Sequence, residues 1–185
     1  MGKDVFIATA GSPQIELRLA GTFGVIRGGT ELPEREIGSR KSRTLLKLLA
    51  VERPTLVPVD RIVDVLWAGK PPAAAEHNVA TLVSRLRAVL GSGIIVGGRH
   101  GYGLAGEPEV SVDLDAAARY CEQAKRTLPA APAIALAAAE QAIGLLSADI
   151  ALAEEPYATW ADPAREQLRQ LAARPRAAVF PAAGG

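Results

Sequence analysis

Residues 77–90 of this 185-residue chain, His-Asn-Val-Ala-Thr-Leu-Val-Ser-Arg-Leu-Arg-Ala-Val-Leu, separate into two faces when they are placed on a helix. One face is an apolar stripe with helical spacing, made of Val79, Val83, Leu86 and Leu90. The opposite face carries His77, Thr81, Ser84, Arg85 and Ala88. Arginine can bond to a guanine edge, a threonine methyl can contact thymine, and hydroxyls can bind phosphate. The stretch predicts a helix that recognises duplex DNA; the competing interpretation is an ordinary amphipathic helix with a solvated polar face.

The distribution of charge along the chain favours the first interpretation. Residues 77–106 contain no Asp or Glu. Residues 1–106 contain 14 Lys and Arg against 9 Asp and Glu, a net charge of +5, whereas residues 107–185 contain 7 against 11, a net charge of −4. A basic first half joined to an acidic second half predicts two domains with different partners, a polyanion for the first and a protein or an uncharged partner for the second.

The composition predicts a globular protein, because 49% of the residues are hydrophobic. Aromatic residues make up only 4%, which favours close-packed helices. The single Cys121 excludes an internal disulfide, and no Cys/His pair has the spacing of metal ligands. The sequence contains neither a signal peptide nor an apolar run long enough to cross a bilayer. We therefore expect a cytoplasmic protein with no cofactor, no metal and no membrane contact.

The first half is expected to begin with strands and continue with helices. Residues 14–19 alternate with period two, residues 23–27 resume the pattern, and Gly28-Gly29 is a hairpin turn signal. Ser39 can cap a helix over about residues 40–52, and Pro58 stands near the start of another over about residues 59–67.

The predicted recognition helix, about residues 73–90, follows these elements. Residues 94–96 and 102–104 then predict a hairpin with a flexible basic tip. Strands, three helices and a hairpin, in that order, are the layout of a winged helix. In this layout the third helix enters the major groove, and the hairpin, called the wing, over residues 94–104, contacts the flanking groove.

Four motifs in this order resemble a known family. They are Gly-Ser-Arg-Lys-Ser-Arg-Thr-Leu-Leu at 38–46, Asp-Arg-Ile-Val-Asp-Val-Leu-Trp at 60–67, Val-Ser-Arg-Leu-Arg-Ala-Val-Leu-Gly at 83–91, and Gly-Tyr at 101–102. Together they closely resemble the OmpR-type DNA-binding domain of the actinobacterial antibiotic regulatory proteins, the AfsR- and EmbR-like activators. The resemblance covers about residues 14–106 and implies a winged-helix fold.

The resemblance continues into the second half. Val-Asp-Leu-Asp at 112–115, followed by a helical run, resembles the start of the bacterial transcriptional activation domain, a helical unit similar to tetratricopeptide repeats. Helices are predicted over residues 114–125, 133–146 and 163–171. This segment is about half the length of the family's domain, so we expect a partial array whose last apolar face needs a cover.

The expected fold class is therefore α+β, an N-terminal winged helix followed by a short all-α segment. The expected boundaries are a flexible leader over residues 1–13, the winged helix over 14–106, the partial helical domain over 107–175 and a disordered tail over 176–185.

The resemblance also implies roles for single residues. The positions of Thr81 and Arg85 face bases in this family, and those of His77, Ser84 and Arg87 reach phosphates. Wing residues around Arg99 and Tyr102 contact the flanking groove, and the first motif supplies three more DNA-binding candidates, Arg40, Lys41 and Arg43. Ala80 and Leu82 stand where the family commonly has polar residues, and Gly103 stands where a larger one is common, which implies thinner base recognition and a weaker wing contact.

Other apparent motifs carry no chemistry. Gly-Tyr-Gly-Leu-Ala-Gly at 101–106 matches a dinucleotide-binding pattern, but Glu107-Pro108 follows where a helix should begin. No nucleophile elbow accompanies His77 and His100, so we do not expect an enzyme. The sequence predicts a DNA-binding transcriptional activator of a secondary-metabolite gene cluster. Its expected partners are duplex DNA, RNA polymerase and a second copy on tandem half-sites, and no small-molecule substrate. The alternative is a protein-interaction module whose helical half acts while the winged helix is a scaffold.

Overall fold

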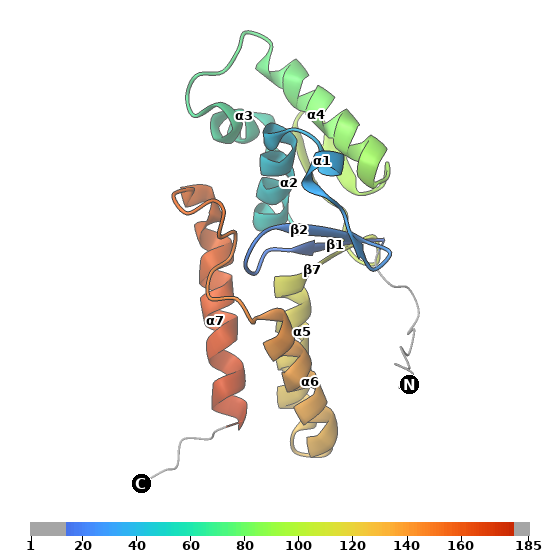
Figure 1. Cartoon of the computed structure of the whole chain (residues 1–185), viewed down its shortest axis with the longest axis vertical. Coiled ribbons are helices and arrows are strands. Elements are labelled where there is room, and N and C mark those ends of the chain that lie inside the picture. The colour runs from blue at the N-terminus through green and yellow to red at the C-terminus, as the bar shows by residue number, and fades with distance from the viewer. Residues whose placement is uncertain (1–13, 180–185) are drawn as a thin grey trace.

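The computed structural model describes residues 14–179, in which two small β-sheets pack with helices α1 to α7. Helices α3 and α4 lie at one end of the molecule and α5, α6 and α7 extend from the other, with α2 and the first sheet between them (Figure 1). The expected α+β class, a winged helix followed by a helical segment, is confirmed. The expected leader, residues 1–13, lies outside the described residues.

The first sheet has the strand order β3-β2-β1-β7. Strand β1 (Ile15–Arg18) pairs antiparallel with β2 (Gly24–Arg27), and β2 pairs antiparallel with β3 (Thr30–Glu31). The turn between β2 and β3 is the predicted Gly28-Gly29, whose φ angles of +56° and +78° favour glycine. On the other side of β1 lies β7 (Val110–Val112), which runs parallel to it. The sequence did not predict β7.

The helices of the first half begin close to the predicted residues. Helix α2 (Arg40–Glu52) starts at the predicted cap, where the Ser39 hydroxyl accepts a hydrogen bond from the Ser42 amide at 3.2 Å. A single turn, α1 (Glu34–Ile37), precedes it and was not predicted. Helix α3 (Val59–Trp67) follows Pro58 as expected. Helix α4 (Ala75–Leu90) is the predicted recognition helix, begun two residues later because the chain still turns at 73–74.

The predicted wing is a hairpin of β5 (Ile95–Gly98) and β6 (Gly101–Leu104). A third strand, β4 (Val57–Pro58), completes a sheet of order β4-β6-β5, so β5 is an edge strand. Gly97 has a φ of +90°, and a Cβ atom there would collide with the carbonyl oxygen of Gly101. The wing therefore depends on glycine for its backbone geometry.

The second half contains α5 (Asp113–Thr127), α6 (Pro132–Leu145), a 3-10 turn (Thr159–Ala161) and α7 (Asp162–Val179). Helices α5 and α6 form a helical hairpin (Figure 1). Helix α7 continues four residues into the expected tail, which corrects the expectation that regular structure ends before residue 176. The two alanines at 177 and 178 favour helix strongly. Residues 180–185 of that tail lie outside the described residues.

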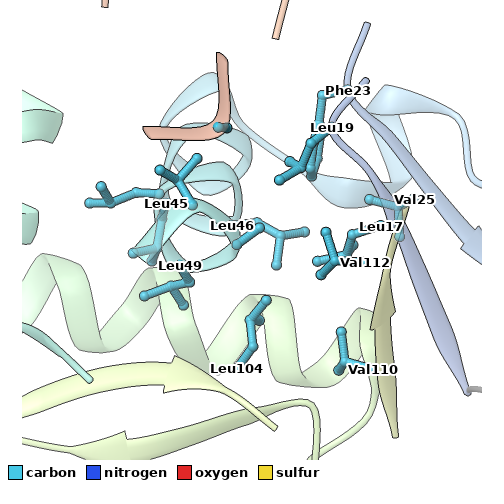
Figure 2. Packing of buried hydrophobic residues seen from close by; sticks show 14 of the residues in the cluster. Leu17, Leu19, Phe23, Val25, Leu45, Leu46, Leu49, Leu104, Val110 and Val112 are labelled. Carbon is cyan, nitrogen blue, oxygen red and sulfur yellow. The ribbon is translucent and has the colours of Figure 1, made fainter. Parts of the chain in front are cut away.

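One hydrophobic core joins both halves. Leu46 of α2 points toward the apolar side chains of the first sheet, where Val112 of β7 lies beside Leu17, and Leu45 and Leu49 of α2 belong to the same core (Figure 2). The same cluster continues into the second half through Leu114, Leu152, Leu168 and Leu171. Residues on both sides of the expected boundary at 106/107 therefore bury their apolar surface together.

Polar contacts also cross between the halves. The Asp113 carboxylate accepts hydrogen bonds from the amides of Leu19 and Ala20, at 2.9 and 2.8 Å. The buried ammonium of Lys47 lies 2.7 Å from Glu154 and 3.0 Å from Glu155.

Candidate nucleic-acid interface

The predicted polar face of α4 is exposed. His77, Ser84, Arg85 and Ala88 are exposed and Thr81 is half-buried, whereas the predicted stripe of Val79, Val83, Leu86 and Leu90 is buried in the core. Leu82 is also buried, at 8% exposure, so it belongs to the core face and does not thin the recognition surface. Ala80 is exposed, so it leaves the recognition surface without a polar side chain at that position. The Thr81 hydroxyl donates to the His77 carbonyl at 3.0 Å, which occupies its proton within the helix.

Two basic residues of the predicted set have no partner among the described residues. Arg85 points from the exposed face of α4, and Arg40 opens α2; both are exposed. The N-terminal turn of α2 lies at the same end of the molecule as α4 (Figure 1). Neither guanidinium has to give up an internal hydrogen bond before it binds an external anion.

Two other residues of the first motif are engaged internally. Lys41 donates to the Leu66 carbonyl at 2.8 Å and lies 4.9 Å from the centre of the Trp67 ring, so it caps the end of α3. Arg43 donates to the Gly38 carbonyl at 2.7 Å and lies 3.4 Å from Glu34. Nearby helix ends and an acidic residue hold both side chains, and their role as DNA-binding residues stays a prediction.

The predicted wing residues also differ in exposure. Arg99 and His100 form its exposed tip, where the Arg99 Nε atom lies 3.0 Å from His100 Nε2. Tyr102 is only 7% exposed, because β6 is the central strand of its sheet. The structure therefore places Tyr102 beneath the wing surface, and its contact with the flanking groove stays a prediction.

Arg87 is engaged within the protein, and its expected contact with a phosphate stays a prediction. Its guanidinium donates to the carbonyls of Ile95 at 2.9 Å and Gly97 at 3.1 Å, and it lies 5.8 Å from the centre of the Tyr102 ring. Sequence analysis also missed Arg27, whose guanidinium donates to the Val89 carbonyl at 2.8 Å, at the C-terminal end of α4. No local pattern signals this contact, since 62 residues separate the two.

No helix within residues 14–179 combines the length and the apolar character needed to span a membrane. The same residues contain no group of three or more His, Cys, Asp and Glu side chains placed to hold a metal ion.

The arrangement of sheets and helices is shared with a solved structure, that of Mycobacterium tuberculosis EmbR in complex with a low-affinity phosphopeptide. The TM-score is 0.63 at 24% identity, over 85% of this chain and 42% of that one. At this identity the likeness shows the fold alone.

Curated relatives match the first half of the chain more closely. AfsR of Streptomyces coelicolor is 33% identical over 94 residues, which are 51% of this chain and 10% of AfsR. EmbR of Mycobacterium tuberculosis is 36% identical over 86 residues, 44% of this chain and 21% of EmbR. DnrI of Streptomyces peucetius is 39% identical over 49 residues, 26% of this chain and 18% of DnrI. The matched part of the chain thus spans between 10% and 21% of the length of these relatives. No protein-family model matches it.

The fold is a winged helix followed by a helical part, as in the EmbR structure. The chain's relatives AfsR, EmbR and DnrI are regulators of the actinobacterial antibiotic regulatory protein family. The resemblance to these regulators that the sequence motifs predicted is confirmed. These relatives are named as regulatory proteins, not as enzymes.

Proposed function

We propose that this chain is a transcriptional regulator that binds duplex DNA, with α4 in the major groove and the wing tip on the flanking backbone. The observation that carries the proposal is the face of α4, where Arg85 is exposed and without a partner among the described residues while the opposite face is buried in the core. An α-helix fits the major groove, and arginine bonds to guanine through two parallel donors.

The proposal assigns different tasks to the exposed cations Arg85, Arg40 and Arg99. Arg85 lies in the C-terminal half of α4 beside Ser84, with exposed alanines at positions 80 and 88. Its exposed guanidinium is therefore suited to recognise a guanine. Arg40 begins α2, before the recognition helix in the chain, and Arg99 lies at the wing tip, after it. These flanking positions suit contacts with phosphates.

Binding of labelled duplexes across a range of salt concentrations tests this assignment. If the protein engages about four to six phosphates, the logarithm of affinity should fall against that of salt with a slope of roughly −4 to −5. Arg85→Ala should cost about 1 to 3 kcal/mol at one base position and relax preference there. Arg40→Ala should weaken all sequences alike and reduce the salt slope by about one.

Lys125→Ala supplies the matched control, since Lys125 is an exposed cation on α5, paired with Glu122 at 3.2 Å and remote from α4 in the fold. A salt-independent affinity, or equal effects of Arg85→Ala and Lys125→Ala, would refute the assignment of α4.

The proposal extends to assembly and to partners. One recognition helix contacts few base pairs, so we propose that two copies occupy tandem half-sites about one helical turn apart. We also propose that the protein activates genes of secondary metabolism through RNA polymerase, as the relationship to AfsR and DnrI suggests. Footprints that show a single copy bound with high specificity to one isolated half-site would contradict the tandem arrangement.

The alternative, a protein-interaction module, is favoured by one observation. Ile134, Leu136 and Ile143 of α6 are each more than half exposed, although large apolar side chains usually lie inside. The two functions separate experimentally: if the protein fails to bind any duplex at low salt while remaining folded, the helical half and not α4 carries the function.

A further inference from the structure

Arg87 connects the recognition helix to the wing at several points. It lies near the end of α4 and is half-buried. Its Nε–H donates to the carbonyl of Ile95, at the start of β5, and its Nη2–H donates to the carbonyl of Gly97, two residues further along the same strand. Its guanidinium also lies over the ring of Tyr102 on β6. One side chain of α4 therefore contacts both strands of the hairpin.

The strand geometry explains why these two carbonyls are available. The Ile94 carbonyl accepts a hydrogen bond from the amide of Ala105, so it points toward the β6 side. Carbonyls alternate in direction along a strand, so those of Ile95 and Gly97 point away from β6. Because β5 is an edge strand, no other strand within residues 14–179 covers that side, and Arg87 supplies the two donors.

We propose that Arg87 is a positioning residue that holds the wing at a set distance and angle from α4. Arg85 and the wing tip then meet bases and backbone as one rigid surface. The planar fork of arginine matches two carbonyls and an aromatic ring at once, whereas the single ammonium of lysine cannot span them. The consequence for DNA binding rests on the proposed function, but the structural role of Arg87 does not.

Hydrogen exchange of the free protein tests the structural role. In Arg87→Ala, peptides covering residues 94–104 should exchange about tenfold faster or more, as expected when charge-assisted hydrogen bonds are lost from a local opening. Peptides of α2 should be unchanged, which shows that the core remains folded. The matched control, Arg85→Ala, should leave the wing as it is in the wild type. Arg87→Lys, which keeps the charge, should also speed wing exchange. Wild-type exchange of the wing in both Arg87 variants overturns the proposal.

A double-mutant cycle on DNA tests the consequence. If Arg87 positions the wing, Arg99→Ala should weaken binding clearly in the wild type and much less in the Arg87→Ala background. If Arg87 acts only as a separate phosphate contact, the two losses should add, and that result contradicts the proposal. Failure of the protein to bind any duplex would refute the proposed function, while the exchange measurement would still decide the role of Arg87.

Discussion

Asp115 and Arg53 form a paired contact between α5 and the end of α2. Arg53 donates from Nε to Oδ2 at 2.6 Å and from Nη2 to Oδ1 at 2.8 Å, and Gln167 of α7 donates to Oδ1 at 3.2 Å. Burial by itself raises the pKa of Asp115, but the hydrogen bonds and charge of Arg53, with smaller contributions from Gln167 and Arg119, outweigh it and hold the pKa below 3.8. The ionised form of Asp115 therefore stabilises the fold.

Asp115→Asn should lower the free energy of unfolding at neutral pH by about 1 kcal/mol, a modest value because the Asp115 side chain is 43% exposed. A carboxylate whose pKa is lower in the folded state stabilises the protein fully at pH values above its pKa of 3.8 in the unfolded chain. This stabilisation is lost as the pH falls from 3.8 through the lower pKa of the folded state. In urea unfolding, the difference in the free energy of unfolding between Asp115→Asn and the wild type should thus shrink as the pH falls below 3.8. A difference that is the same at neutral pH and at about pH 3 would contradict the linkage.

The pH dependence of wild-type stability does not isolate Asp115, because Asp113 acts in the opposite direction. The difference in stability between Asp115→Asn and the wild type is therefore the quantity to measure. Burial raises the pKa of Asp113, only partly offset by hydrogen bonds from the amides of Leu19, Ala20 and Leu114. Its ionisation therefore costs stability as pH rises above 3.8, and acid relieves that cost. Glu109→Gln is a suitable control, since Glu109 is exposed and its side chain has no partner among the described residues.

Lys47 is a second residue whose partners lie across the halves. Lys47→Met replaces the buried side chain by an apolar one and removes the ammonium, which leaves the carboxylates of Glu154 and Glu155 without their shared cation. Removal of one partner from a buried ion pair costs about 3 kcal/mol or more. Urea unfolding should show this loss, and Lys125→Met, in an exposed pair, should change stability little. Similar stability of both variants would show that the buried pair does not hold the halves together.

At the scale of elements, we expect the distal end of the hairpin of α5 and α6 to be less stable than the main core. Its distal contact consists of Ala124, Ala138 and Ala139 with Tyr120, a cluster separate from the main core. Alanine buries little apolar surface, and each Å² removed from water contributes only about 25 cal/mol. The N-terminal part of α5 and helix α7, by contrast, share the main core through Leu114, Leu168 and Leu171.

We therefore expect amides of residues 120–145 to exchange faster than those of α2 in the free protein. This expectation is restricted to the distal end of the hairpin, because the N-terminal part of α5 and helix α7 share the main core. Protection of α6 equal to that of α2 in a dilute monomer would show that the alanine contact is sufficient by itself.

At the scale of the whole molecule, the shared core predicts cooperative unfolding. Strand β7 borders β1, and α7 contacts α2, so the winged helix completes its sheet and core with residues from beyond 106. Calorimetry should show one transition for the full chain. A fragment that ends at Gly106 should unfold at a lower temperature, because it exposes the β1 edge and the apolar face beneath it. Two separate transitions, or a fragment as stable as the full chain, would show that the halves fold independently.

The sequence by itself determined the elements whose signals are local. The apolar period of residues 79–90, the Ser39 cap and the Gly28-Gly29 turn each depend on residues a few positions apart, and the structure confirms all three. The family resemblance was likewise visible in short motifs with a common order. The exposed position of Arg85 followed from helical spacing alone.

Tertiary structure decided which basic residues remain available and how the halves meet. Lys41, Arg43 and Arg87 look like free cations in sequence, but carbonyl groups of other elements engage them. Strand β7 is too short to show a strand pattern, and only its neighbour β1 makes it one. Hydrogen-bond partners and strand pairing depend on residues distant in sequence, which local patterns do not encode, whereas helical periodicity arises within a few turns of the chain.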